Sequence, residues 1–289
     1  MTNQLGVFEL NRVHTGDSRD LIAQLPDNSI DVVVTSPPYW GQRMSSGSGV
    51  EDDPRQYVED LVSMFNILLP KMTARSTLWL NVGDAYNTPV NWKLEDRRYS
   101  TLGPNSTGLE AGNSAYTKPR HARKAFVDKE VPWLTYGNLL ALPYRMVIGM
   151  SDGGWLFRGE VVWKKKNPMP EGKARRPHRQ HESIYLFARN EKHDFRTIPP
   201  VGSVWEFGTD KLEGLKHFSR FPIELPARCI QASGLTGSDV VVLDPFAGSG
   251  STGLAALSLG CSFLGFEIDA DQADSANTRL ADSPTPLTL

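Results

Sequence analysis

Short runs of consecutive apolar residues alternate with stretches of helical periodicity along this chain. The pattern predicts strands near residues 11–16, 30–35, 76–82, 156–163, 183–188, 240–244 and 263–267, and helices near 17–25, 56–69, 139–150 and 252–259. Strands rich in Val and Leu, without polar alternation, are typical of a sheet that helices cover on both faces. The sequence therefore predicts the α/β class, with a single open, mostly parallel seven-stranded sheet and helices on both faces.

Residues 84–132 interrupt this pattern. They are rich in Gly, Ser, Asn, Pro and basic residues and show little periodicity, which indicates an inserted loop region. We therefore expect residues 1–83 and 133–289 to form the two parts of one domain. The chain has 289 residues, of which 39% are hydrophobic, and this is enough for a packed core.

Neither membrane insertion nor metal binding is indicated by the composition. No run approaches the roughly 18 apolar residues of a membrane span, and the first residues lack the blocks of a signal peptide, so we expect an intracellular protein. Cys229 and Cys261 lie in periodic apolar segments and are predicted to be buried thiols. His178 and His181 do not match a zinc pattern, and no metal is expected.

Basic residues are concentrated in two short segments, although the net charge is only -2. The clusters are Lys164, Lys165, Lys166, Lys173, Arg175, Arg176 and Arg179, and then Lys118, Arg120, Arg123 and Lys124. Local groups of cations on a balanced protein suit a phosphate-binding cleft, because affinity depends on how many phosphates are neutralised together. A solvated basic loop is the alternative interpretation.

A glycine-rich turn follows the predicted strand at 240–244 and begins a helix. Gly248, Gly250 and Gly253 fit the pattern Gly-x-Gly-x-x-Gly, in which the backbone bends tightly and approaches a ligand closely. Glu267 ends the next predicted strand, where an acid can accept hydrogen bonds from ribose hydroxyls. Alone, this turn is compatible with either NAD or S-adenosylmethionine.

The hexapeptide Thr-Ser-Pro-Pro-Tyr-Trp at residues 35–40 ends another buried strand. Ligand-binding groups of α/β enzymes lie at this end of their strands. Consecutive prolines fix φ twice and remove two amide donors, so the carbonyl oxygens are held outward as acceptors. The alternative is a structural Pro-Pro turn in which Tyr39 and Trp40 fill core space.

Together the two turns resemble the motifs of S-adenosylmethionine-dependent DNA amino-methyltransferases. Asp-Pro-Phe-x-Gly-Ser-Gly at residues 244–250 resembles the cofactor motif, and Ser-Pro-Pro-Tyr at residues 36–39 resembles the catalytic motif. The catalytic motif comes first in this chain, which is the circularly permuted, β-type order of that family. The resemblance implies a Rossmann-like methyltransferase fold, S-adenosylmethionine as the cofactor and double-stranded DNA as the substrate.

The resemblance also implies roles for individual residues. Asp244 would pair with the amino end of the cofactor's methionine moiety, Glu267 would hold the ribose, and Asp17 would contact the adenine. The alternative for Asp17 is an ordinary helix N-cap, and the residue can serve as both. The other implied cofactor residues are Phe246, Ala247, Gly248, Ser249, Gly250 and Thr252, with Phe221 and Pro222 in the element that closes over the cofactor's carboxylate end.

The predicted catalytic residues are Ser36, Pro37, Pro38 and Tyr39. A base amino nitrogen is a poor nucleophile because its lone pair is delocalised into the ring. If the Ser36 side chain and the Pro37 carbonyl accept its hydrogens, the lone pair points at the sulfonium methyl group, so positioning and preorganised dipoles supply the catalysis. Tyr39 offers a flat face on which a base flipped out of the duplex can stack.

The first residue of the catalytic motif indicates the target base. A serine at this position resembles the motif of the N4-cytosine enzymes, whereas the N6-adenine enzymes usually carry Asp or Asn there. We therefore predict a site-specific cytosine-N4 DNA methyltransferase of a restriction-modification system. An N6-adenine enzyme is the nearest alternative, followed by an NAD-dependent oxidoreductase and a catalytically silent DNA-binding protein. Carbon-5 methylation is disfavoured because neither Cys229 nor Cys261 has the Pro-Cys setting of those enzymes.

We assign the two basic clusters and the insertion at 84–132 to DNA contact and target recognition. The resemblance implies that Asn167 lies beside the pocket for the target base. The alternative is that Asn167 belongs to a rigid loop without a role in binding. The expected partners are double-stranded DNA and a cognate restriction endonuclease, and the expected state is a monomer or homodimer. We expect a cytoplasmic, nucleoid-associated enzyme with no membrane partner.

Overall fold

One twisted sheet, with eight strands among the described residues, forms the centre of the molecule. The computed structural model describes residues 4–41, 48–88, 125–168, 175–198, 202–208 and 222–282. Across the sheet the strands are β3 (Arg12–Thr15), β10 (Ser262–Glu267), β9 (Val241–Asp244), β4 (Ile30–Thr35), β5 (Met72–Asn81), β7 (His181–Ala188), β6 (Leu156–Lys165) and β8 (Val204–Phe207). Of these strands, β7 runs antiparallel to its neighbours, β5 and β6, and the other pairs are parallel. The predicted open, mostly parallel α/β sheet is confirmed.

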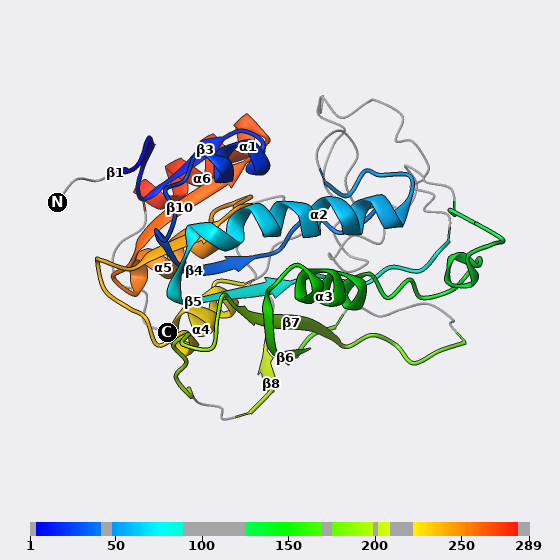
Figure 1. The fold of residues 1–289 in the computed structure, drawn as a ribbon. Helices are drawn as coiled ribbons and strands as arrows, with labels where there is room; N and C mark the ends of the chain where they lie inside the picture. The colour runs from blue at the N-terminus through cyan, green and yellow to red at the C-terminus, as the bar shows by residue number, and fades with distance from the viewer. Residues whose placement is uncertain are drawn as a thin grey trace, which may run out of the picture.

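Helices pack on both faces of this sheet (Figure 1). The first face carries α1 (Ser18–Ala23), α2 (Pro54–Leu68) and α3 (Leu142–Asp152), and the second carries α4 (Glu224–Ala232), α5 (Ser251–Ser258) and α6 (Ala270–Ala281). In β5, Leu78 and Leu80 pack in the first core, whereas Trp79 packs in the second. Because side chains alternate along a strand, a fully apolar strand supplies both cores. None of the helices in the described residues is long and apolar enough to span a membrane.

Smaller elements complete the described chain. A hairpin of β1 (Gln4–Leu5) and β2 (Phe8–Glu9) precedes the sheet, and short 3-10 helices lie at Leu69–Lys71 and Pro132–Leu134. Cys229 and Cys261 are buried free thiols, as predicted.

The predicted number of seven strands is wrong, because the sheet has an eighth strand at its edge. Strand β8 has only four residues, and its exposure alternates so that Trp205 and Phe207 are buried. Glu206 interrupts its apolar residues, so β8 lacks the continuous apolar run that marks the equally short β9. The sequence pattern also missed two helices, α4 and α6. In α6 the buried residues are Ala273, Ala276 and Leu280, which form only a narrow apolar stripe.

Strands from opposite ends of the chain meet at the centre of the sheet. Val32 of β4 pairs with Val242 of β9, and Val33 pairs with Leu243. The two strands are parallel, so their carboxyl ends lie at the same edge. The predicted catalytic and glycine-rich turns leave the sheet from these neighbouring ends, where open α/β sheets bind ligands.

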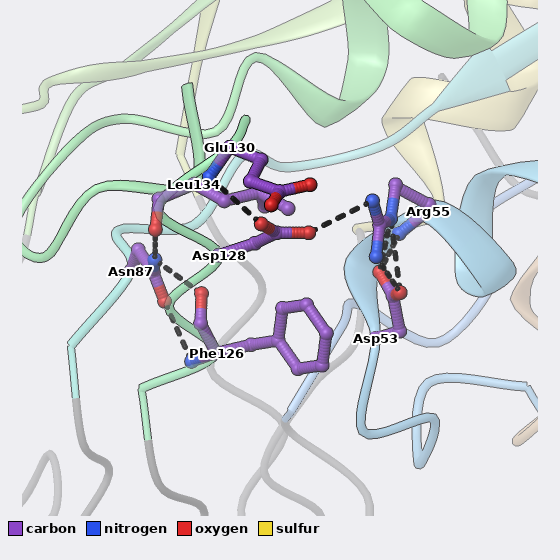
Figure 2. Close-up of polar contacts among 7 residues, drawn as sticks. All are labelled: Asp53, Arg55, Asn87, Phe126, Asp128, Glu130 and Leu134. Carbon is purple, nitrogen blue, oxygen red and sulfur yellow. Dashed lines mark hydrogen bonds and ion pairs between the residues drawn. The ribbon is translucent and has the colours of Figure 1, made fainter. Parts of the chain in front are cut away.

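The chain after β5 is anchored by a buried asparagine, Asn87 (Figure 2). Its amide nitrogen donates to the carbonyl oxygens of Phe126 (2.7 Å) and Leu134 (2.8 Å), and its amide oxygen accepts from the Phe126 nitrogen at 2.9 Å. Asp128 then contacts Arg55 near the start of α2 at 3.3 Å. These contacts fix residues 125–134 against the rest of the domain.

Candidate active site

A cavity of about 250 Å³ opens at the carboxyl edge of the sheet. Asp17, Pro38, Phe246 and Glu267 line it from the ends of β3, β4, β9 and β10, respectively. The other lining residues are Ser18, Arg19, Ser48, Glu51, Asp60, Met64 and Ile268. One cavity therefore joins Pro38 of the predicted catalytic turn to residues of the predicted cofactor site.

The glycine-rich turn is held against β10 by hydrogen bonds that its backbone amides donate. The Ala247 nitrogen donates to the Phe266 oxygen at 2.9 Å, and the Gly248 nitrogen donates to Glu267 Oε2 at 2.9 Å. Gly250 has φ +79°, a left-handed conformation that favours glycine. A Cβ atom at Gly253 would lie 2.7 Å from the ring of Phe263, so glycine is needed there for α5 to pack on the sheet.

Asp244 is buried behind this turn, with 1% of its surface exposed. Its Oδ1 accepts hydrogen bonds from Thr35 Oγ1 (2.7 Å) and the Phe246 nitrogen (3.0 Å), and its Oδ2 accepts from Thr252 Oγ1 at 2.6 Å. Burial raises the pKa of the Asp244 carboxyl from 3.8 to about 6, although the threonine hydrogen bonds act in the opposite direction. The carboxylate thus connects the end of β4 to the start of α5.

Asp17 serves as the N-cap of α1 and also lines the cavity. Its side chain accepts a hydrogen bond from the Arg19 nitrogen at 2.8 Å. The next residue, Ser18, donates to the Pro245 carbonyl and so joins α1 to the turn after β9. Glu267 accepts a second hydrogen bond, from the Asp269 nitrogen at 3.1 Å. Two of the three predicted cofactor acids, Asp17 and Glu267, are therefore held in place at the cavity.

The catalytic turn after β4 is fixed through its second proline. Tyr57 of α2 donates its hydroxyl to the Pro38 carbonyl at 2.9 Å. Among the described residues, no donor reaches the Pro37 carbonyl. The half-buried Ser36 hydrogen-bonds the Tyr39 hydroxyl. The carbonyl of the buried Pro37 is therefore left without a hydrogen-bond donor among the described residues.

Tyr39 is held by polar groups from two neighbouring strands, β5 and β7, and a lysine of β6 extends the network. Its hydroxyl lies 2.9 Å from Glu182 Oε2 and 3.3 Å from Asn81 Oδ1, and Lys165 forms an ion pair with Glu182. Burial, and then the charge of Glu182, raises the pKa of the Tyr39 phenol well above its ordinary value, so the hydroxyl stays neutral. A Cβ atom at Gly83 would lie 2.5 Å from the Tyr39 ring. The orientation of the Tyr39 ring is thus fixed by hydrogen bonds at its hydroxyl and by close packing of Gly83 against the ring.

The predicted DNA-contacting residues are divided by the structure. Lys165 lies within the Tyr39 network, and Lys164 forms an exposed ion pair with Glu206 at 3.3 Å. Arg176 stacks over the Tyr86 ring at 4.3 Å, and Arg179 donates to the Asp84 carbonyl at 2.9 Å. The remaining described members, Lys166, Asn167 and Arg175, are exposed. Their role in binding DNA stays a prediction.

Some predicted site residues lie outside the described residues, namely Lys118, Arg120, Arg123, Lys124, Lys173 and Phe221. Pro222 is buried just before α4, where its carbonyl accepts from the Leu225 nitrogen at 3.0 Å, and it is not among the cavity-lining residues. Ser249 lies in the turn, where its carbonyl accepts from Arg279 at 2.9 Å.

Sequence reasoning did not single out several residues that shape the site. Glu51 lines the cavity, Thr35 binds Asp244, and Glu182, Asn81 and Gly83 surround Tyr39. Thr35 and Gly83 lie at strand ends, and this position could have marked them as site residues because open α/β sheets bind ligands there. Glu182 gave no such signal, because its contact with Tyr39 depends on the pairing of β5 with β7.

Comparisons with known proteins agree with this geometry. A family model described as DNA methylase (N6_N4_Mtase) matches residues 30–278. The type II methyltransferase M.XycI of Xanthomonas campestris pv. cyanopsidis is 34% identical over 280 residues, covering 92% of this chain and 86% of the relative. M.Cfr9I of Citrobacter freundii, also a type II methyltransferase, is 32% identical over 295 residues, covering 96% of this chain and 91% of the relative.

Solved structures share the fold at lower sequence identity. The PvuII DNA methyltransferase, described as cytosine-N4-specific, has a TM-score of 0.66 at 19% identity, covering 93% of this chain and 89% of that one. A putative DNA modification methylase of Thermus thermophilus, TTHA0409, in complex with S-adenosylmethionine, has a TM-score of 0.61 at 22% identity, covering 93% of both chains.

Proposed function

The chain belongs to the DNA methylase family, and from this premise we propose that it methylates the N4 amino group of cytosine in double-stranded DNA. As a member of this family it is a DNA methyltransferase whose cofactor is S-adenosylmethionine. Its relatives are named type II methyltransferases, which supports a role in a restriction-modification system with a cognate endonuclease as partner. The observation that carries the proposal is the cavity that Pro38 of the catalytic turn shares with Phe246 of the glycine-rich turn and with the acids Asp17 and Glu267.

The residues of the cavity fit this cofactor. Bound there, it supplies a methyl group activated by a neighbouring sulfonium charge. Asp17, Glu51, Asp60 and Glu267 give the lining an acidic character that complements a sulfonium and an ammonium group. Glu267 lies at the end of β10, in position to accept hydrogen bonds from ribose hydroxyls, and Asp17 lies at the end of the adjacent β3. An NAD-dependent oxidoreductase is not supported by family membership.

The catalytic turn has the groups that an amino nitrogen requires. The Ser36 side chain and the Pro37 carbonyl accept the two hydrogens of the target amino group, and this directs the nitrogen lone pair towards the cavity. The contact from Tyr57 holds the turn in place before substrate binds, so little reorganisation is needed during methyl transfer.

Tyr39 stacks against the flipped base, and the exposed cations of residues 164–179 contact the flanking phosphates. Stacking on an aromatic ring contributes about 1–3 kcal/mol, which is comparable to the few kcal/mol needed to unstack a base. A ring already held by Glu182 and Gly83 loses little freedom on stacking. Cytosine is favoured over adenine by the serine at the first motif position, although a serine could accept a hydrogen from either amino group.

The target base is tested by methylating synthetic duplexes and identifying the modified nucleoside by mass spectrometry. N4-methylcytosine is the expected product, and 6-methyladenine as sole product would overturn the proposed target. Ser36→Ala and Tyr39→Ala should slow methyl transfer while cofactor binding is preserved, and Asp244→Ala should weaken cofactor binding. Unchanged turnover in all three variants would contradict the assigned roles. Cofactor and DNA binding without any methylated product would instead indicate a silent DNA-binding protein.

A further inference from the structure

Glu51 is a cavity-lining carboxylate that the sequence motifs do not include. We propose that Glu51 pairs with the ammonium group of the cofactor's methionine moiety and so fixes the cofactor beside the catalytic turn. This assignment rests on the proposed methyl transfer, because it requires the methionine moiety to lie at the Pro38 side of the cavity.

The loop that carries Glu51 is tied to the catalytic turn. Trp40 donates its indole nitrogen to the Glu51 carbonyl at 2.8 Å, and the Gly41 nitrogen donates to the Gly49 carbonyl at 2.8 Å. A Cβ atom at Gly49 would lie only 3.0 Å from the Tyr39 carbonyl. The position of the Glu51 carboxylate is therefore fixed relative to the residues that present the target amino group.

The other acids of the cavity already have partners or lie at its other end. Asp60 forms an ion pair with Arg19 at 3.2 Å. Asp17 and Glu267 lie on the adjacent strands β3 and β10, where the adenosine would be held. The cofactor's sulfonium separates its adenosine from its methionine moiety, so the ammonium group falls towards the catalytic turn. Glu51 is the carboxylate at that end.

The immediate contacts of Glu51 also suit an incoming cation. Its carboxylate accepts from the Gly49 nitrogen at 2.8 Å, and no cationic side chain among the described residues forms an ion pair with it. Burial raises the pKa of the Glu51 carboxyl and nearby Asp60 adds to this, whereas the Gly49 amide and the charge of Arg19 act in the opposite direction. A bound ammonium group would favour the ionised form and offset this cost.

Asp244 is less suited to a direct contact, although its motif position implies one. Its two oxygens accept three hydrogen bonds from Thr35, Thr252 and the Phe246 nitrogen, and it is not among the cavity-lining residues. The structure therefore gives Asp244 a positioning role behind the turn, while Glu51 faces the cavity.

Calorimetric titration of the full chain without DNA tests this assignment. The probes are S-adenosylhomocysteine, which carries the amino acid moiety, and 5′-methylthioadenosine, which lacks it. In Glu51→Gln the amide oxygen can still accept from Gly49, but the negative charge is lost. We expect the Kd for S-adenosylhomocysteine to rise about tenfold to a hundredfold, as for loss of a charge-assisted hydrogen bond, and the Kd for 5′-methylthioadenosine to stay unchanged.

Asp52→Asn is the matched control, because it removes one negative charge at the neighbouring exposed position. Both Kd values should match those of the wild type in this variant. If Glu51→Gln binds S-adenosylhomocysteine with wild-type affinity, the proposal is overturned. The ammonium contact would then be assigned to Asp244 if Asp244→Asn weakens binding of S-adenosylhomocysteine but not of 5′-methylthioadenosine. Equal weakening of both probes in Glu51→Gln also overturns it, because Glu51 would then only shape the cavity. The nucleoside analysis is independent of these titrations, so a wrong target base would leave their result intact.

Discussion

Replacing Asp244 with asparagine should change how the stability of this protein depends on pH. The wild-type carboxyl is buried and its pKa is raised from 3.8 to about 6. Asparagine is nearly isosteric, and its amide oxygen can accept from Thr35 and the Phe246 nitrogen. Its amide nitrogen can then donate to the Thr252 hydroxyl, which also lies 3.4 Å from the Val34 carbonyl. The substitution therefore removes the charge and keeps a partner for both threonine hydroxyls and for the Phe246 nitrogen.

The expected size follows from the pKa shift. An acid whose pKa is higher in the folded state stabilises the fold fully below its unfolded pKa, and this contribution is lost as the pH rises through the folded pKa. Relative to a neutral group, the ionising carboxyl lowers the free energy of unfolding by about 0.5 kcal/mol at pH 4 and about 3 kcal/mol at pH 8. The stability of Asp244→Asn relative to wild type should therefore rise by about 2.5 kcal/mol between these pH values.

Urea denaturation followed by tryptophan fluorescence measures this difference at fixed ionic strength from pH 4 to pH 8. Any constant loss of hydrogen-bond strength in the variant shifts the whole curve and leaves its slope intact. Asp52→Asn controls for the change in net charge. A stability difference for Asp244→Asn that does not change with pH would refute the reasoning, since the carboxyl would then titrate alike in the folded and unfolded chains.

Three further substitutions test the scaffold around the site. Gly83→Ala places a Cβ atom 2.5 Å from the Tyr39 ring, so we expect a loss of about 1–3 kcal/mol in the free energy of unfolding. Methyl transfer should also slow while the cofactor Kd is unchanged, and wild-type turnover would show that the ring orientation does not matter. Asn87→Ala removes a buried amide with several hydrogen bonds and should cost about 2–4 kcal/mol in urea denaturation, whereas the exposed Asn138→Ala should cost less than about 1 kcal/mol. Equal losses in the two asparagine variants would argue against the anchoring role. Glu182→Gln weakens the hold on the Tyr39 hydroxyl and should lower the single-turnover rate roughly tenfold without changing the cofactor Kd, which titration of S-adenosylhomocysteine checks.

The elements with strong local patterns were predictable from the sequence. Seven strands and four helices could be predicted because their sequences contain apolar runs or a helical period, and such patterns depend only on residues close together in the chain. The turns at residues 36–39 and 244–250 were likewise recognisable, because consecutive prolines and closely spaced glycines restrict or free the backbone locally. Strand β8 and helix α6 were not, because Glu206 interrupts the apolar residues of the first and the second buries mainly small alanines.

What the sequence determined by itself is the chemistry available at each strand end, namely a serine and prolines at one and an acid and glycines at the other. Only the tertiary structure decided which groups share a space. The pairing of β4 with β9 brings Thr35 to Asp244, and the pairing of β5 with β7 brings Glu182 to Tyr39. Such contacts join residues more than 140 positions apart, and they follow from burying both faces of one sheet. No local pattern encodes them, because each partner alone is compatible with many neighbours.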